Sequence, residues 1–174
     1  MFLRVAVLAP VVLSLSGAAS AQVKELAPGD YQCTAPAGDY HEQEIASLPV
    51  GKRVDVRFRA LADAASADYP MQASIRFVTP SGKMDVQLGK ANNEPTHLYL
   101  ATWVTATHTS NVVDQYPLSE EWVQVGIEID AAGIVHVTSR SKKATLNLGT
   151  TAPVQTYLHC HSGTFEVQVL RPQS

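Results

Sequence analysis

The chain has 174 residues, a formal net charge of −3, 45% hydrophobic residues and 17% charged residues. This length suits one domain, and the composition is that of a globular protein rather than a disordered, collagen-like or proline-rich chain. Because the 16 acidic residues slightly outnumber the 13 basic ones, the charge gives no reason to expect a nucleic-acid partner.

The N-terminal segment has the pattern of a secretory signal peptide. Arg4 supplies a positive start, residues 5–15 form an apolar run, and residues 19–21 (Ala-Ser-Ala) offer a small-residue cleavage site. The apolar run is shorter than the roughly 20 residues that a membrane-spanning helix needs, and no later stretch of the sequence is long and apolar enough. We expect a signal peptide at 1–21, a single mature domain at 22–174, and a secreted or periplasmic location.

The mature chain holds two cysteines, Cys33 and Cys160. In an oxidising compartment an even pair favours one disulfide, which would bring two Cα atoms from opposite ends of the domain within about 7 Å. The alternative is a thiol–metal site, because His159 and His161 flank Cys160 and a His-x-His pair on a strand can hold half of a zinc site. We expect the disulfide and no cofactor, and keep His159 and His161 as secondary metal-ligand candidates.

Segments of alternating apolar and polar residues follow one another along the chain. A period of two is typical of half-buried strands. The segments are 53–60, 72–77, 84–88, 98–107, 123–130, 134–138, 146–148, 154–160 and 165–169. Gly and Pro turns such as those at 79–82 and 131–133 separate them.

Helices are not expected, because no segment keeps a 3.6-residue apolar period. The Ala-rich residues 61–68 indicate a loop or a single turn, and longer polar loops are expected near 62–70, 90–96 and 110–120. About nine to eleven short strands without intervening helices predict an all-β antiparallel sandwich or barrel.

Two stretches resemble a known superfamily. Residues 121–137 (EWVQVGIEIDAAGIVHV) open an alternating strand with Trp122 and return after a Gly turn, and residues 157–167 (YLHCHSGTFEV) place a Gly turn before the last strand. These features are similar to the concanavalin A-like jelly rolls, which include laminin G-like and legume-lectin-like domains. The resemblance implies a jelly-roll β-sandwich whose terminal strands pair, in agreement with a Cys33–Cys160 bridge. An immunoglobulin-like sandwich or a lipocalin-like barrel is the alternative.

The same resemblance directs attention to carboxylates. Retaining glucanases of this superfamily carry Glu-x-Asp-x-Glu on one strand, with nucleophile and acid on the same face. Here Glu128 and Asp130 begin the pattern, but Ala132 occupies the position of the last Glu. We therefore assign no catalytic residue and expect Asp130 to support the turn that follows.

A possible binding surface lies on the segment 96–107. If this strand is regular, His97, Tyr99 and Trp103 share one face, and the two aromatic rings form a platform on which a sugar ring can stack. Arg76 would add a polar contact if its strand lies in the same sheet, as would Arg57 and Arg59. The alternative places Trp103 in the core between the sheets.

We expect an exported, non-catalytic β-sandwich that binds a carbohydrate or another cell-envelope component. One alternative is a glycoside hydrolase or lyase of the same fold with a non-standard site. Another is a structural or protein-interaction protein of the envelope. Apolar-in, polar-out strands suit a monomer or a dimer formed through an edge strand.

Overall fold

The computed structural model describes residues 20–64, 70–91 and 94–170, and all regular structure in these residues is β-strand. Most of the predicted signal peptide (1–19) therefore lies outside the described residues. The strands are β1 (Gln22–Ala27), β2 (Asp30–Ile45), β3 (Arg53–Asp63), β4 (Gln72–Thr79), β5 (Gly82–Ala91), β6 (Glu94–Val104), β7 (Thr109–Pro117), β8 (Val123–Ile129), β9 (Ile134–Ser139), β10 (Lys142–Asn147) and β11 (Gln155–Leu170).

The two longest strands, β2 and β11, pair with each other and bend together. Their register shifts between His161 and Gly163. At the bend Ser162 is buried in a left-handed conformation with φ of 48°, and its Oγ accepts a hydrogen bond of 3.0 Å from the backbone N–H of Gly38. A Cβ on Gly163 would come within 2.7 Å of Met71 Cγ. A glycine is therefore needed at position 163 for the close approach of the segment that contains Met71.

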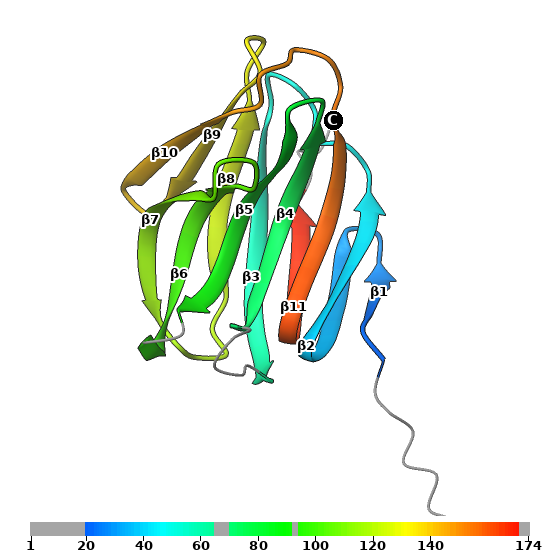
Figure 1. The fold of residues 1–174 in the computed structure, drawn as a ribbon, viewed down its shortest axis with the longest axis vertical. Coiled ribbons are helices and arrows are strands. Elements are labelled where there is room, and N and C mark those ends of the chain that lie inside the picture. The colour runs from blue at the N-terminus through cyan, green and yellow to red at the C-terminus, as the bar shows by residue number, and fades with distance from the viewer. Residues whose placement is uncertain (1–19, 65–69, 92–93, 171–174) are drawn as a thin grey trace, which may run out of the picture.

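The bend divides the strands into two layers, and Figure 1 shows β4 to β7 across β3 and β8 to β10. Residues 163–170 of β11 pair with β3, which continues to β8, β9 and β10; with β1 and the first half of β2 these strands form sheet I. Residues 155–161 of β11 pair with β4, which continues to β5, β6 and β7; with the second half of β2 they form sheet II. The predicted antiparallel jelly-roll sandwich is confirmed, with eleven strands in the residues that the structure describes.

A disulfide crosses the core between the layers. Cys33 projects inward from sheet I and Cys160 from sheet II, both fully buried, with their Cα atoms 6.1 Å apart. In the β2–β11 ladder Cys33 lies opposite Phe165 and Cys160 opposite His41, so the bridge links the two arms of the bend rather than neighbours within one layer. The predicted disulfide is confirmed.

Several segments differ from the sequence-based expectation. Strands β1 and β2 were not predicted, and the expected loops 62–70 and 90–96 partly lie in β3, β5 and β6. Residues 110–120 were expected to form a loop, but most of them belong to β7, which pairs with β6. The pattern is irregular because the register shifts between Leu100 and Ala101, which places Val113 and Asp114 in consecutive buried positions and leaves Val112 exposed. The bulge in the edge strand β7 therefore interrupts the alternation of apolar and polar residues from which strands were predicted.

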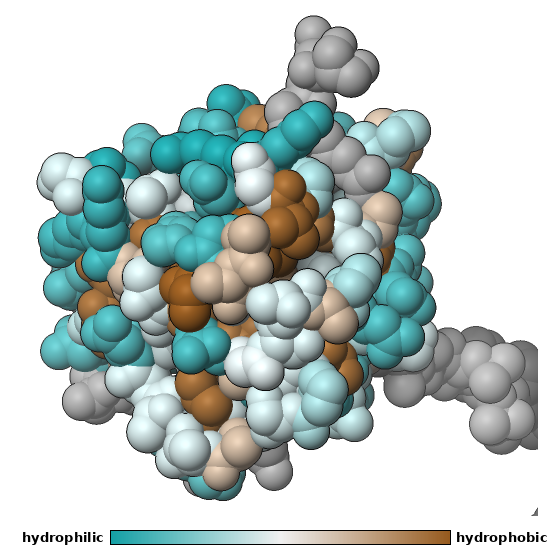
Figure 2. All heavy atoms as spheres, turned by 90° about the horizontal axis from the view of Figure 1, so that it is seen from above, coloured by the Kyte–Doolittle hydropathy of each residue, from teal (hydrophilic) through white to brown (hydrophobic). Residues whose placement is uncertain are grey.

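The surface of the sandwich carries scattered rather than concentrated apolar groups. On the end seen in Figure 2, hydrophobic residues appear as several separate patches among hydrophilic ones. The large hydrophobic side chains that are exposed lie in separate segments: Leu26, Tyr40, Val50, Val112 and Leu170. No helix of sufficient length and hydrophobicity to traverse a bilayer is present in the described part of the chain.

Removal of the disulfide is expected to destabilise the sandwich strongly. The bridge closes a loop with a sequence separation of 127 residues, and the chain-entropy model assigns such a loop up to about 5 kcal/mol. The double variant Cys33→Ala/Cys160→Ala should lose about 3–5 kcal/mol of unfolding free energy in urea denaturation. A loss below about 1 kcal/mol would mean that the bend and the core hold the layers together without the bridge.

Candidate functional site

The outer face of sheet II gathers most of the polar and aromatic side chains singled out in the sequence. Antiparallel register aligns its outward-pointing residues in rows that run across six strands. The three rows are Glu44, Tyr157, Arg76, Asp85, Trp103 and Ser110; Glu42, His159, Ser74, Gln87, Ala101 and Val112; and Tyr40, His161, Gln72, Gly89, Tyr99 and Gln115.

A cavity of about 420 Å³ lies on this face over β4 to β7. Tyr99 and Trp103 of β6 both line it, and the small residue Ala101 lies between them on the same strand. Strand geometry puts residues four apart at roughly 13 Å along the strand. The cavity is therefore a shallow trough with an aromatic ring towards each end.

Small and amide-bearing residues shape the trough on the neighbouring strands. Gly89 lies opposite Tyr99, and a Cβ there would come within 3.0 Å of the Met71 carbonyl oxygen, so a larger side chain would crowd this wall. Gln72 and Gln87 are half-buried and line the same cavity. Their amide groups can donate and accept hydrogen bonds beside the aromatic rings.

Trp103 is only partly buried and projects from the outer face. The interpretation that Trp103 fills the core between the sheets is therefore wrong. Its ring makes an edge-on contact with His108, with a centroid distance of 6.3 Å. The core is instead filled by Phe58 and Phe165 of sheet I and by Phe77 of sheet II.

A charge network extends beside the trough on the same face. The guanidinium of Arg76 donates two hydrogen bonds to the fully buried carboxylate of Asp85, with Nε–Oδ1 and Nη2–Oδ2 distances of 2.7 and 3.0 Å. Arg76 also pairs with Glu42, which accepts hydrogen bonds from Lys83 Nζ at 3.1 and 3.2 Å. Bidentate pairing of this kind fixes both partners in one geometry.

The electrostatics of this network favour the charged forms of its acid and base. Burial opposes ionisation of Glu42, but hydrogen bonding to Lys83 and the charge of Arg76 hold the pKa of Glu42 below its usual value. Burial likewise opposes the charge on Arg76, and the two carboxylates outweigh it, so the pKa of Arg76 is raised. Both side chains are therefore ionised at neutral pH.

His159 lies within this network as a neutral imidazole. Its Nδ1 is 3.4 Å from Ser74 Oγ, and Ser74 Oγ donates to Asp85 at 3.2 Å. Burial, reinforced by the positive charge of Arg76, lowers the pKa of His159 to about 3. The exposed ring of Tyr40 lies beside it, with ring centroids 6.0 Å apart.

The sequence-predicted ligand residues are only partly brought together. Tyr99 and Trp103 share the trough, and Arg76 is on the same face, in the row of Trp103 but bound to Asp85. His97 instead lines a neighbouring cavity and lies 3.9 Å from Glu94. Arg57 and Arg59, on β3 of sheet I, do not share this sheet.

His161 and Asp130 take up structural contacts. His161 Nδ1 lies 3.2 Å from the carbonyl oxygen of Pro70, and the described residues contain no group of three His, Cys, Asp or Glu side chains placed for a metal ion. Asp130 Oδ1 accepts hydrogen bonds of 2.9 Å from the backbone N–H groups of Ala132 and Ile134. The expected turn-supporting role of Asp130 is confirmed.

Sequence reasoning missed Gln72, Gln87 and the small residues Gly89 and Ala101, which form the floor of the trough. Each lies on a strand that was predicted, but their approach to Tyr99 depends on the register among β4, β5 and β6. The turn at 79–82 constrains the register of β4 against β5, but alternation alone does not show which strands pair with β6.

Comparison of the chain with protein-family models and with curated proteins gives no match. Similar solved structures include CG-16, a homodimeric agglutinin from chicken liver, with 14% identity over 76% of this chain and 97% of that chain and a TM-score of 0.45. They also include the carbohydrate binding module CBM66 from Bacillus subtilis, with 8% identity over 86% of this chain and 90% of that chain and a TM-score of 0.44. A third is a Bacillus licheniformis beta-glucanase, with 7% identity over 86% of this chain and 82% of that chain and a TM-score of 0.47. Likeness at this level identifies neither a ligand nor an activity for this chain.

The neutral His159 predicts a specific dependence of stability on pH. Between pH 6.5 and about 3 the unfolded chain protonates this imidazole and the folded chain does not. Unfolding free energy should therefore fall as the pH drops below 6.5, by up to about 1.4 kcal/mol per pH unit from this group.

The contribution can be isolated by substitution. His159→Gln should flatten the loss of urea stability between pH 6.5 and 5 relative to the wild type. The matched control is His108→Asn, because His108 is exposed and its positive φ of 51° suits asparagine. Equal pH slopes for the wild type and His159→Gln would show that His159 takes up its proton equally in the folded and unfolded chains, which would contradict a lowered pKa in the folded state.

Proposed function

We propose that the protein binds carbohydrate, and that the trough between Tyr99 and Trp103 on the outer face of sheet II is the binding site. The observation that carries the proposal is the arrangement of two half-buried aromatic rings at the ends of a floor of small residues. The flat apolar faces of sugar rings stack on such aromatic side chains.

Polar groups beside the rings support the same chemistry. Gln72, Gln87 and Lys90 line the trough with Tyr99 and Trp103. Amide and ammonium groups at the edge of an aromatic platform can bond sugar hydroxyls and fix the orientation of the ring. A trough of about 13 Å can hold more than one sugar ring.

The adjacent charge network of Arg76 and Asp85 holds this part of the face rigid, and we assign it no catalytic role. Arg76 and Asp85 are held by a two-point hydrogen bond in the row that contains Trp103, so this part of the face is fixed before any ligand arrives. Preorganised contacts reduce the entropy cost of binding.

The pKa shifts of Glu42 on this face and of Asp130 in the turn between β8 and β9 do not favour the hydrolase alternative. A glycosidase general acid needs a raised pKa, whereas Lys83 and Arg76 overcome the effect of burial and lower the pKa of Glu42. Hydrogen bonds from His136 and from the turn backbone likewise lower the pKa of Asp130. We therefore propose binding without catalysis.

Export completes the proposal. A disulfide between Cys33 and Cys160 suits an oxidising compartment. Strand β1 begins at Gln22, the residue expected to follow cleavage of the signal peptide 1–21. We propose that the mature protein is the sandwich of residues 22–174, that it is secreted or periplasmic, and that its partner is a glycan or another envelope component.

The test is retention of purified mature protein on an array of neutral glycans. The wild type should be retained by at least one glycan, and Trp103→Ala should weaken that binding by roughly tenfold or more, which corresponds to about 1.4 kcal/mol. Gln87→Ala should weaken it less, because one hydrogen bond contributes less than a stacked ring.

The matched control is Trp122→Ala, the other tryptophan of the chain. Trp122 packs under Arg59, whose Cζ is 4.7 Å from the ring centroid, in the other layer, so its removal should leave glycan retention unchanged. Equal retention of Trp103→Ala and the wild type, or no retention of the wild type by any glycan, would refute the proposal.

A further inference from the structure

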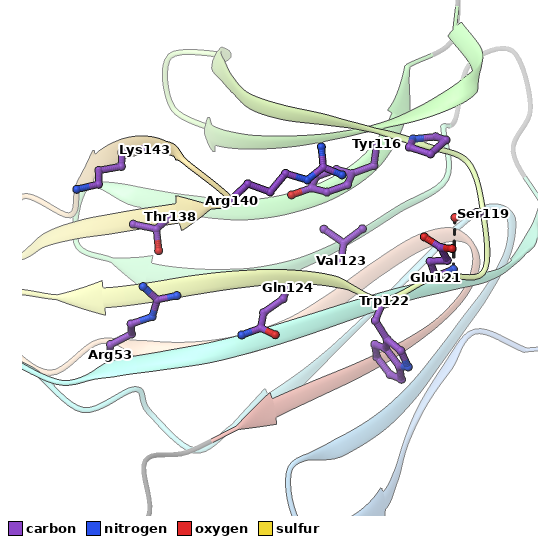
Figure 3. Close-up of a pocket in the computed structure, with 11 residues that line it drawn as sticks. Arg53, Tyr116, Ser119, Glu121, Trp122, Val123, Gln124, Thr138, Arg140 and Lys143 are labelled. Atoms are coloured by element: carbon purple, nitrogen blue, oxygen red, sulfur yellow. Dashed lines mark hydrogen bonds between the residues drawn. The ribbon is translucent and has the colours of Figure 1, made fainter.

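A second cavity, of about 470 Å³, opens at the edge of the sandwich where β7 ends and β8 begins (Figure 3). Three cationic side chains line it: Arg140 and Lys143 from the β9–β10 hairpin, and Arg53 from β3 on the opposite side. Glu121 is the only carboxylate among its lining residues, all of which lie in the described part of the chain. The cavity therefore presents an excess of positive charge.

Arg140 is held in position from two sides. Its guanidinium carbon lies 4.2 Å from the ring centroid of Tyr116, and the Tyr116 hydroxyl is hydrogen-bonded to Ser139 Oγ. Its Nε lies 3.9 Å from Oδ2 of Asp114. Stacking on a tethered ring fixes the plane of a guanidinium and keeps its edge open to solvent.

The guanidinium of Arg53 lies over Gly126, which has no side chain to block it. A Cβ on Gly126 would lie 2.3 Å from Arg53 Cζ and Nη2 and 2.5 Å from Thr138 Oγ1. Glycine thus leaves a space on β8 over which the guanidinium and the hydroxyl converge. Asp55 accepts a hydrogen bond of 2.9 Å from Arg53 Nε. This bond uses Nε alone, so the Nη groups of Arg53 remain on the side of Thr138.

A neighbouring cavity of about 510 Å³ shares Arg140 with the first and contains a buried acceptor. Asp114 is only 3% exposed. Its Oδ1 accepts hydrogen bonds of 2.9 Å from Lys142 Nζ and from the backbone N–H of Gln115, while Oδ2 has no hydrogen-bond partner in the described structure. A buried acceptor without a hydrogen-bond donor is unfavourable. Because Oδ2 is itself buried, a hydroxyl that enters this cavity donates to it only after the side chains around Oδ2 shift.

We propose that these two cavities form one binding site for an acidic oligosaccharide that contains uronic acid. The carboxylate of the sugar pairs with Arg53, Arg140 and Lys143, and a hydroxyl of the adjoining sugar donates to Asp114 Oδ2. An inorganic anion would satisfy only the cations, and a neutral sugar only the acceptor. This site lies apart from the Tyr99–Trp103 trough and does not rest on the function proposed for it.

The experiment is calorimetric titration of the full mature protein with a galacturonic acid trisaccharide at low salt. Two further titrants separate the contributions: the same trisaccharide with all carboxylates methyl-esterified, and sodium sulfate. The acidic trisaccharide should bind at least roughly tenfold more tightly than either, and its affinity should fall as salt increases.

The variant Arg53→Gln/Lys143→Gln should weaken binding of the acidic trisaccharide by roughly tenfold or more. Both side chains are well exposed, so the fold should be retained, which circular dichroism checks. The control Lys24→Gln removes one positive charge from β1, remote from both cavities.

Several results would overturn the proposal. These are absence of binding by the wild type, an equal effect of the control and site variants, or sulfate binding as tight as that of the acidic trisaccharide. Loss of binding in Trp103→Ala with full binding in Arg53→Gln/Lys143→Gln would place the ligand in the trough instead. Failure of neutral glycans in the array experiment would leave these outcomes unaffected, so the two proposals fail separately.

Discussion

The bend shared by β2 and β11 is the constraint on which the rest of the sandwich depends. These strands are the only ones in the described structure that contribute to both layers. Ser162 and Gly163 allow the ladder to turn, and the Cys33–Cys160 bridge ties one arm to the other across the core. Because β3 and β4 both pair with β11, the placement of every later strand in each sheet follows from this bend.

The bend also determines what each outer face can do. The first half of β11 places His159 beside Ser74 and so brings the charge network of Arg76 and Asp85 into the middle of sheet II. Strand β6 lies next to β5, which carries Asp85, and small residues there leave a trough between Tyr99 and Trp103. The opposite edge, where β7 approaches the β9–β10 hairpin, is less regular, and it is there that the cationic cavities open.

The sequence predicted the architecture well and the site in part. Alternation identified strands such as β3, β4 and β8 because one face of each is buried, and the cysteine count identified the bridge. β1 was missed because it is almost wholly exposed, and β7 because a bulge interrupts its alternation. β2 was also missed, because burial alternates only along its first half. Periodicity placed Tyr99 and Trp103 on one face but could not decide whether that face pointed inward, since a one-residue change of register exchanges the two faces. The contacts of His159, Gln87 and Asp114 depend on strand order, which local patterns do not encode.

The chain has two tryptophans, one on each outer face, so indole N–H signals in a nitrogen–proton NMR spectrum report the two faces separately. The most direct test of glycan binding on sheet II is to titrate isotope-labelled protein with a retained neutral saccharide, after assigning the signals with single Trp→Phe variants. We expect the Trp103 signal to move in proportion to saturation while the Trp122 signal stays in place. Movement of the Trp122 signal alone, or of neither signal, would contradict the account.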